Sequence, residues 1–383
     1  MSLKIAYCIP SLYSVSGMEK TLTIKANYFA EQLGYKVYII LTDGKNRPEA
    51  FPLSSKIEVI NLDINYDKIW GYPLYKKIFL YSFKQLAFRR RLSETLREIS
   101  PDITVSLLRR EINFLNKIKD GSKKIGELHF NKSNYRDFNS PRTINMPFRT
   151  HLSKIMMYQL VRKLRKLDRF VVLSHEDMQK WHELSNISVI YNPIEGFPEK
   201  VSDCSSKKVI SAGRFVKQKG FDMLIRSWKI VAEKHPDWTL TIYGSGDKSW
   251  FREEATRLGI GGSCYFEEAV SDLNDKFAES SIFAFSSRFE GFGMVITEAM
   301  SCGIPPVAFA CPCGPKDIIE DGLNGLLIKP GNVTELADKI CYMIDNPEFR
   351  KELGRKARIR SEIFKIEKIA IEWDNLFKQL VSE

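Results

Sequence analysis

The stretch from Ser286 to Gly303 reads Ser-Ser-Arg-Phe-Glu-Gly-Phe-Gly-Met-Val-Ile-Thr-Glu-Ala-Met-Ser-Cys-Gly. The apolar run just before it, Ile282 to Phe285, predicts a buried strand, and Met294 to Met300 predicts a helix. A glycine-containing loop, Glu290 to Gly293, joins the two. The first turn of a helix presents unpaired N–H groups and a partial positive charge, and glycine lets a ligand approach the backbone. The junction is therefore suited to bind an anion or sugar hydroxyls.

Two carboxylates frame this loop. Glu290 stands at its start, and Glu298 lies eight positions later, about a turn and a half inside the predicted helix. One carboxylate is therefore expected at the mouth of the site and the other deeper along the same ligand. Such a pair suits an extended polyhydroxylated molecule.

The composition is that of a globular protein. The chain has 383 residues, 44% apolar and 27% charged, which leaves room for about two domains. No apolar run approaches the roughly 18 residues that a membrane span needs. Leu3 to Ile9 is expected to form a first buried strand rather than a signal peptide, because no small-residue cleavage site follows it. Seven scattered cysteines favour reduced thiols in the cytoplasm.

Short apolar runs alternate with longer helix-like segments, which predicts an α/β fold with doubly wound parallel sheets. In the first domain, residues 1–192, strands are predicted at Leu3–Cys8, Lys36–Leu41, Lys56–Ile60, Ile103–Ser106, Lys124–Glu127 and Phe170–Leu173. After a linker the pattern restarts in a second domain, residues 207–364, with strands predicted at Val209–Ala212, Thr239–Tyr243, Cys264–Phe266, Ile282–Phe285, Pro306–Ala308 and Gly325–Ile328. Two such sheets in tandem are expected to face each other across a cleft, with a ligand at the carboxyl ends of their strands.

Four motifs, in a fixed order, resemble the signature of one enzyme family. Gly213 to Gly220 reads Gly-Arg-Phe-Val-Lys-Gln-Lys-Gly, Glu290 and Glu298 form a Glu-x7-Glu pattern, and Cys313 to Ile319 and Asn324 to Leu327 follow. Together they are similar to the retaining nucleotide-sugar glycosyltransferases of family 4 (group 1). That resemblance implies the GT-B fold of two Rossmann-like domains, with a C-terminal helix, here residues 365–383, that crosses back onto the first domain.

The resemblance also implies roles for the charged residues of the second domain. Arg214 and Lys219 would stabilise the departing nucleoside diphosphate, since fixed cations help most where negative charge builds up in the transition state. Glu298 would bind the ribose hydroxyls, and Glu290 would hold hydroxyls of the donor sugar. Without the resemblance, Arg214 and Lys219 would be interpreted as solvated loop charges and Glu290 as a helix cap.

Backbone groups complete the implied donor site. The N–H groups of the turn would contact the donor sugar; its residues are Gly291, Phe292, Gly293 and Met294. Gly213 belongs to the diphosphate loop, and Gly244 lies in a second glycine turn where a nucleotide would come close to the backbone.

In the first domain, Ser16-Gly17-Met18-Glu19 resembles the family's Gly-Gly-x-Glu-Arg turn, which implies that Gly17 and Glu19 face the donor. The match is looser here, because Ser16 replaces the first glycine and Lys20 replaces the arginine. Glu127-Leu128-His129 is similar to the family's Glu-x-His segment, which places His129 near the reacting sugar. A lone histidine is otherwise more often structural.

No bound metal or cofactor is expected besides the nucleotide sugar, which is a substrate. The chain contains no Asp-x-Asp motif, and Cys311-Pro-Cys313 lacks the second pair or nearby histidine that a metal site needs.

The basic residues are concentrated in the first half. Residues 1–196 carry 32 Lys and Arg against 19 Asp and Glu, whereas residues 197–383 carry 26 against 28. Two predicted helices hold many of them, with Lys76, Lys77, Phe79, Phe83, Arg89, Arg90 and Arg91 in one and Arg162, Lys163, Arg165 and Lys166 in the other. An anionic membrane face with a lipid-diphosphate acceptor and an ordinary solvated surface both fit this pattern. Nucleic acid is disfavoured as a partner.

The sequence therefore predicts a metal-independent, retaining hexosyltransferase of the cytoplasm, peripheral to the membrane if the basic face docks there. It would move a hexose or N-acetylhexosamine, with uridine diphosphate the expected carrier, to a glycan or lipid-linked acceptor for bacterial capsule, lipopolysaccharide or other surface polysaccharide. The alternatives are an epimerase or phosphorylase of the same fold, or a non-catalytic basic protein that binds nucleic acid or membrane.

Overall fold

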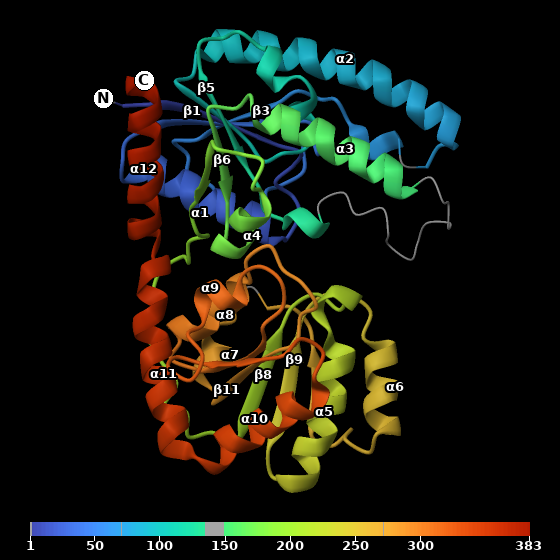
Figure 1. Ribbon diagram of the computed structural model, residues 1–383, viewed down its shortest axis with the longest axis vertical. Coiled ribbons are helices and arrows are strands. Elements are labelled where there is room, and N and C mark those ends of the chain that lie inside the picture. Colours follow the sequence, from blue (N-terminus) through green and yellow to red (C-terminus); the bar gives the residue numbers. More distant parts are fainter. Residues whose placement is uncertain (1, 70, 135–148, 271) are drawn as a thin grey trace. The chain divides into compact units, whose positions relative to one another are not determined.

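The computed structural model describes residues 2–69, 71–134, 149–270 and 272–383. They form two compact units (Figure 1). Unit 1 consists of Met1–Leu173, Asp177–Pro193 and Ile366–Glu383, and unit 2 of Ser174–Glu176 and Ile194–Lys365. Each unit contains one parallel sheet covered by helices.

Within the described part of unit 1, seven parallel strands pair in the order β3-β2-β1-β4-β5-β6-β7. Their bounds are β1 Lys4–Ile9, β2 Lys36–Leu41, β3 Glu58–Asn61, β4 Ile103–Ser106, β5 Lys123–Glu127, β6 Arg169–Val172 and β7 Ile187–Val189. The helices are α1 Gly17–Glu31, α2 Leu74–Ile99, α3 Arg149–Leu164, α4 His175–Lys180 and α12 Ile366–Ser382.

The alternation of side chains along the strands divides the core of unit 1 into two layers. On β1, Ile5 and Tyr7 pack with apolar residues of α1 and α12, whereas Ala6 and Cys8 pack with those of α2 and α3. Helices therefore cover both faces, as a parallel sheet requires.

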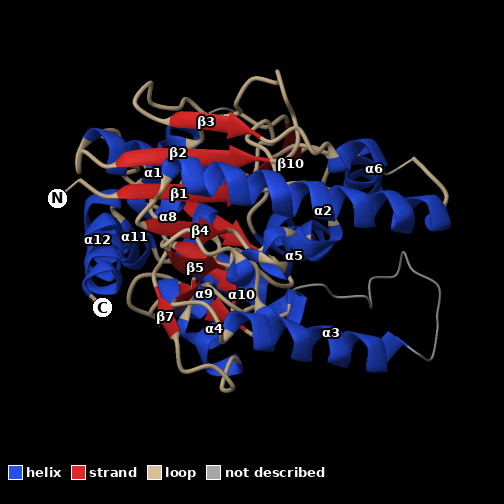
Figure 2. Cartoon of the chain, turned by 90° about the horizontal axis from the view of Figure 1, so that it is seen from above, coloured by secondary structure: helices blue, strands red, loops and turns tan. Residues whose placement is uncertain are grey.

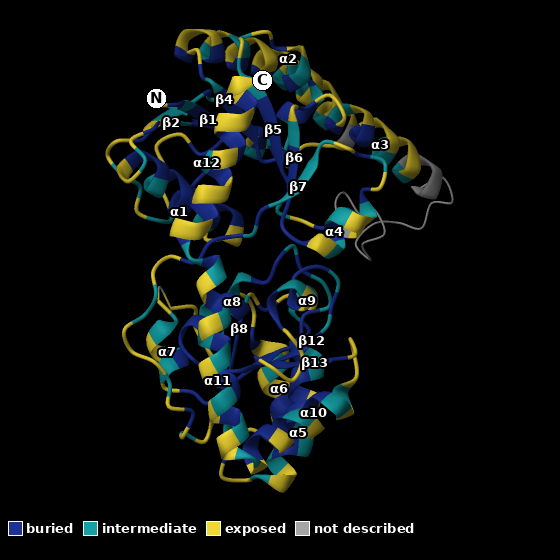
Figure 3. Cartoon of the chain, turned by 60° about the vertical axis from the view of Figure 1, so that its left-hand side comes forward, coloured by how far each residue is buried: buried dark blue, intermediate teal, exposed yellow. Residues whose placement is uncertain are grey.

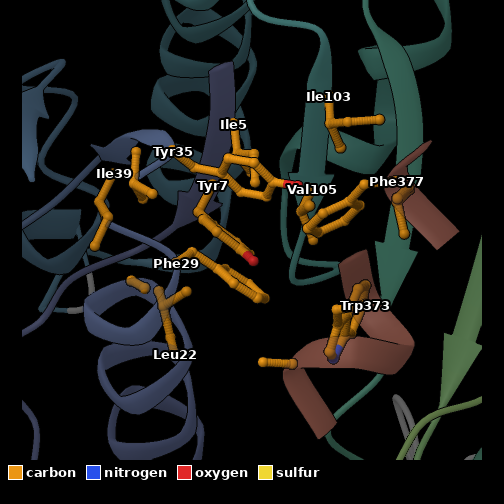
Figure 4. Packing of buried hydrophobic residues seen from close by; sticks show 14 of the residues in the cluster. Ile5, Tyr7, Leu22, Phe29, Tyr35, Ile39, Ile103, Val105, Trp373 and Phe377 are labelled. Atoms are coloured by element: carbon orange, nitrogen blue, oxygen red, sulfur yellow. The ribbon is translucent and has the colours of Figure 1, made fainter. Parts of the chain in front are cut away.

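The C-terminal helix α12 belongs to unit 1. Trp373 and Phe377 lie on its inner face and pack against Phe29 of α1, whose ring centroid is 5.6 Å from that of Phe377 (Figure 4). Exposed residues alternate with this buried stripe along the helix (Figure 3). The predicted return of the C-terminal helix to the first domain is confirmed.

In unit 2, as far as it is described, six parallel strands pair in the order β10-β9-β8-β11-β12-β13. Their bounds are β8 Lys208–Ala212, β9 Thr239–Tyr243, β10 Cys264–Glu267, β11 Ile282–Phe285, β12 Pro306–Phe309 and β13 Leu326–Ile328. The helices are α5 Phe221–Lys234, α6 Ser249–Arg257, α7 Asn274–Ala278, α8 Met294–Ser301, α9 Pro315–Ile318, α10 Val333–Asp345 and α11 Pro347–Ser361.

The predicted α/β class with two doubly wound sheets is confirmed, and each predicted strand is present with small shifts at its ends. Sequence reasoning missed β7, Ile187–Val189. This strand is a three-residue edge strand whose side chains are only half-buried, so it lacks the apolar run that marks the central strands.

Candidate active site

The predicted donor-site residues of unit 2 lie on loops at one edge of its sheet. These loops follow the carboxyl ends of β8, β9 and β11, and Met294 and Glu298 lie in the helix α8 that comes after β11. Strand β8 lies between β9, the next strand along the chain, and β11, so the chain changes direction across the sheet at this point. The carboxyl edge at such a reversal is where open α/β sheets bind ligands.

Lys219 and Glu290 form an ion pair that joins two of these loops. Lys219 Nζ is 2.7 Å from Glu290 Oε1, and both side chains are largely buried, with 16% and 9% of their surface exposed. Ser286 Oγ donates a hydrogen bond of 2.9 Å to the carbonyl of Lys219. The residue expected at the diphosphate and the one expected at the donor sugar are therefore in direct contact.

Three residues that sequence reasoning did not select hold the same loops together. Arg288 donates two hydrogen bonds, 2.8 and 2.7 Å long, to the carboxylate of Asp222 at the start of α5. Gln218 Nε2 donates to the carbonyl of Phe289, and the carbonyl of Gln218 accepts from Arg288 N. Arg288 lies inside the Ser286 to Gly303 stretch, but its partner is 66 positions away. Local spacing therefore gave no signal for this contact.

Glycine allows the backbones of adjacent loops to approach closely. A Cβ at Gly244 would lie 1.8 Å from the carbonyl oxygen of Gly213, and one at Gly314 would lie 1.6 Å from that of Phe292. At Gly213 a Cβ would lie 3.2 Å from the Cδ and Cε atoms of Lys219. A larger residue at Gly244 or Gly314 would force the loops apart, because a real Cβ does not come within 3.0 Å of another heavy atom.

The helix α8 begins as predicted, directly after the glycine loop. Its N-cap is Gly293, with φ 97°, in the left-handed region that favours glycine. Glu298 lies in the second turn and is half-buried. Gly291 and Met294 are also half-buried, and Phe292 is buried with its ring centroid 5.7 Å from that of Phe364.

Arg214 is placed differently from Lys219. It lies in the same loop but is exposed, and its described contacts do not include the Lys219–Glu290 pair. Its backbone carbonyl accepts from Val216 N at 2.8 Å, which shapes the turn. Lys219 is thus held in position, whereas Arg214 is accessible to a ligand.

In unit 1, Gly17 and Glu19, which were predicted to face the donor, lie at the start of α1, after β1. Gly17 is exposed and begins the helix, while the Glu19 side chain is buried and accepts a hydrogen bond from Ser16 Oγ. Ser16, the departure from the family pattern, therefore holds Glu19 in position.

His129 lies beyond the end of β5, beside a buried ion pair. His129 Nε2 is 3.1 Å from Glu127 Oε1, and the same oxygen contacts Lys25 Nζ of α1. The Lys25 and Glu127 side chains are each only 1% exposed. Burial alone would raise the pKa of Glu127, but the nearby Lys25 ammonium and the His129 ring outweigh it and lower that pKa to about 2. Glu127 is therefore ionised wherever the protein is folded near neutral pH.

Sequence reasoning also missed Arg109, in the loop after β4. Its guanidinium lies 4.8 Å from the ring centroid of Phe130, next to His129, and its Nη2 is 3.5 Å from Met18 Sδ at the start of α1. Arg109 thus contacts the sequence neighbours of two predicted site residues, Phe130 beside His129 and Met18 beside Glu19. The sequence feature that could have identified Arg109 is its position just after a predicted strand.

The described residues contain no group of three or more His, Cys, Asp or Glu side chains that could hold a metal ion. Cys311 and Cys313 are buried and form no disulfide. Burial, with the nearby Glu290 carboxylate, raises the pKa of the Cys311 thiol. Across the same described ranges, no helix combines the length and the apolar character needed to cross a bilayer.

Comparison with known proteins gives matches along the whole chain. Residues 195–360 match the family described as Glycosyl transferases group 1. An uncharacterized glycosyltransferase of Haemophilus influenzae is 29% identical over 389 residues, which cover 97% of this chain and 99% of the relative. The poly(ribitol-phosphate) alpha-N-acetylglucosaminyltransferase of Staphylococcus aureus is 27% identical over 67% of this chain, which spans 51% of that relative.

A solved structure has the same fold over both units. The S. aureus TarM mutant crystallised with fondaparinux, alpha-GlcNAc-glycerol and UDP aligns with a TM-score of 0.76 and 17% identity, covering 98% of this chain and 100% of TarM. The family match in unit 2 and this shared fold agree with the four motifs. Residues 195–360 therefore form a group 1 glycosyltransferase domain, and the chain has the GT-B fold.

Proposed function

We propose that this protein is a retaining transferase that moves a hexose or N-acetylhexosamine from a uridine diphosphate sugar to a glycan or lipid-linked acceptor. The product would be a bacterial surface polysaccharide, such as a capsule or lipopolysaccharide, assembled in the cytoplasm. The observation that carries the proposal is the Lys219–Glu290 pair, which has a cation and a carboxylate side by side at the carboxyl edge of the sheet.

The relatives support the substrate class. TarM was crystallised with fondaparinux, alpha-GlcNAc-glycerol and UDP, and the S. aureus relative acts on poly(ribitol-phosphate) according to its name. Buried cysteines that form no disulfide also suit a reducing compartment.

The proposed chemistry needs no protein nucleophile. The bond between the sugar and the diphosphate breaks, and a bond from the acceptor oxygen forms on the same face of the sugar. The acceptor proton passes to the departing diphosphate oxygen. Lys219 and Arg214 offset the charge that develops on the diphosphate, so that bond cleavage becomes easier. Glu298 holds the ribose, and Glu290 and the N–H groups before α8 hold the sugar hydroxyls.

His129 is proposed to contact the reacting sugar from unit 1. The ionised Glu127 lies 3.1 Å from His129 Nε2, and its charge favours one orientation of the imidazole. Gly17 and Glu19 are proposed to line the donor at the start of α1.

A panel of nucleotide sugars, incubated without acceptor, tests the proposal. Slow release of nucleoside diphosphate and free sugar is expected from one uridine diphosphate sugar, and NMR should show that the sugar keeps its anomeric configuration. A converted nucleotide sugar with no free diphosphate would indicate an epimerase. Sugar phosphate formation in the presence of phosphate would indicate a phosphorylase.

A further inference from the structure

Two helices of unit 1 extend past the edge of its sheet on the same side (Figures 1 and 2). In both cases it is the N-terminal half that projects. Along α2, no residue between 75 and 87 is buried, whereas Phe88, Leu92 and Leu96 are completely buried against the sheet. Along α3, residues 153–159 are likewise exposed or half-buried, and burial begins at Leu160.

The projecting halves carry large apolar side chains. Those that form the overhang surface are Tyr75, Phe79, Phe83 and Leu86 of α2 and Ile155 and Tyr158 of α3, each between 54% and 77% exposed. On α2 they recur at intervals of three or four residues, so they form one stripe. The rings of Phe79 and Phe83 pack edge to face at 4.6 Å. A stripe of large exposed apolar side chains like that on α2 marks an interaction site rather than ordinary surface.

The charge around this stripe has one sign. The sequence segments 68–93 and 138–167 each contain seven Lys or Arg residues and no Asp or Glu. Not all of these cations are accessible, because Lys84 and Arg91 donate to the carbonyls of Ile64 and Leu62. Lys76 and Arg89 are exposed on α2, and Lys154 is exposed on α3. Exposed cations thus flank the apolar stripe.

We propose that the overhang surface inserts into the headgroup region of an anionic membrane. Aromatic and aliphatic side chains partition into the interface, while flanking lysines and arginines contact anionic lipid headgroups. Lys76 lies over the ring of Tyr72 at 4.2 Å and Arg162 over that of Tyr158 at 5.9 Å, so both cations sit next to aromatic rings, as residues at an interface do.

Two other partners fit less well. A nucleic acid would use the cations and stack on the aromatic rings, but Leu86 and Ile155 have no part in stacking or phosphate binding. A second copy of the chain would bring two basic surfaces together at a symmetric interface, where like charges repel. A membrane accepts the aromatic, aliphatic and basic components together.

This inference goes beyond the proposed function and does not depend on it. If the proposed function is also correct, the membrane surface supplies the lipid-linked class of acceptor, as opposed to a free glycan.

Flotation of the full chain with vesicles tests the proposal. We expect binding to an equal mixture of phosphatidylglycerol and phosphatidylcholine at low salt, and little binding to phosphatidylcholine alone. The variant Phe79→Ser/Phe83→Ser should partition at least about tenfold more weakly, because two exposed phenylalanines leave the interface. Lys76→Gln/Lys77→Gln should lose about fivefold for each lysine. Arg91 is left intact because its hydrogen bonds to the segment before α2 make it structural.

The matched control is Ile359→Ser/Ile371→Ser, which removes two residues of similar exposure, 55% and 58%, from α11 and α12. It should bind as the wild type does. Circular dichroism and the rate of donor hydrolysis should be the same for all variants, which separates a docking defect from misfolding or a failed function. Absence of wild-type binding would overturn the proposal. So would unchanged binding of the phenylalanine variant together with displacement by RNA, which would assign the surface to nucleic acid.

Discussion

The buried ion pair between Lys25 and Glu127 is predicted to be essential to unit 1. Lys25 Nζ contacts Glu127 Oε1 and lies 4.4 Å from the ring centroid of Trp373, on the C-terminal helix. The pair thus joins α1, the end of β5 and α12. In the variant Lys25→Met the carboxylate stays buried without its cation, while the apolar stem still fills the space. Removal of one partner of a buried pair costs about 3–5 kcal/mol of unfolding free energy.

The pKa of Glu127 gives a similar magnitude. Its folded value is about 2, against an ordinary value of 4.5, and this difference corresponds to about 3 kcal/mol. Because the folded pKa is lowered, the stabilisation is present above pH 4.5 and is lost as the pH falls toward 2. In Lys25→Met, burial is no longer opposed by the lysine, so the Glu127 pKa should rise. The loss of unfolding free energy in the variant, relative to the wild type, should then shrink as the pH is lowered from neutral. Protonation of Glu127 removes the uncompensated buried charge.

Urea unfolding of unit 1, followed by the tryptophan fluorescence to which Trp373 contributes, measures both effects at neutral pH and at about pH 5. The double variant Lys25→Met/Glu127→Leu should recover most of the loss. Lys45→Met is the control in the same unit, because its ion pair with Asp63 is solvent-exposed, with side chains 54% and 39% exposed. Its cost should stay near 1 kcal/mol or less. A loss below about 1 kcal/mol in Lys25→Met, with an unchanged pH profile, would refute the reasoning.

Three further predictions concern the donor site. Lys219→Ala and Arg214→Ala should each lower kcat/KM roughly a hundredfold in steady-state assays, with Lys219→Arg only partly active, whereas Ala at the exposed neighbour Lys217 should leave kcat/KM near normal. Near-normal turnover of both Lys219→Ala and Arg214→Ala would contradict the assignment of these two cations to the diphosphate. Glu298→Ala should weaken nucleoside diphosphate binding by at most about 1.5–3 kcal/mol per lost hydrogen bond; equal affinity in calorimetry would leave Glu298 a purely structural role. Activity should persist in excess EDTA, and a full loss that Mg²⁺ or Mn²⁺ restores would contradict metal-independent catalysis.

The fold was predictable because its signals are local. Each central strand is a short apolar run, and the stripe of α12 repeats with helical spacing, so periodicity alone identifies both. The loop before α8 was predictable for the same reason, since Gly293 marks the left-handed turn that starts the helix. The edge strand Ile187–Val189 lacks such a signal and was missed.

The contacts within the candidate site were not predictable, because they join residues far apart in sequence. Lys219 and Glu290 were assigned to different parts of the donor, the diphosphate and the sugar, and their ion pair spans 71 positions. Lys25 lies within an ordinary amphipathic pattern, and nothing local distinguishes it from a surface lysine of α1. Its burial depends on Glu127, 102 positions away, and on the C-terminal helix. Only the packing of these elements creates the low-dielectric site in which the pair matters.

The Lys219–Glu290 pair bears on how the donor site can work. A lysine that was free in solution would lose side-chain entropy when it bound a diphosphate, whereas Glu290 and the backbone at Gly213 already restrict Lys219. The same carboxylate partly neutralises the lysine in the free protein. In the proposed reaction, the attraction of Lys219 for the departing diphosphate would grow as negative charge accumulates there, while its attraction to Glu290 would stay constant. Interactions that strengthen along the reaction coordinate lower the barrier rather than only tightening binding. The pairing is therefore compatible with a catalytic lysine, and it makes the effects of changes at Lys219 and Glu290 interdependent.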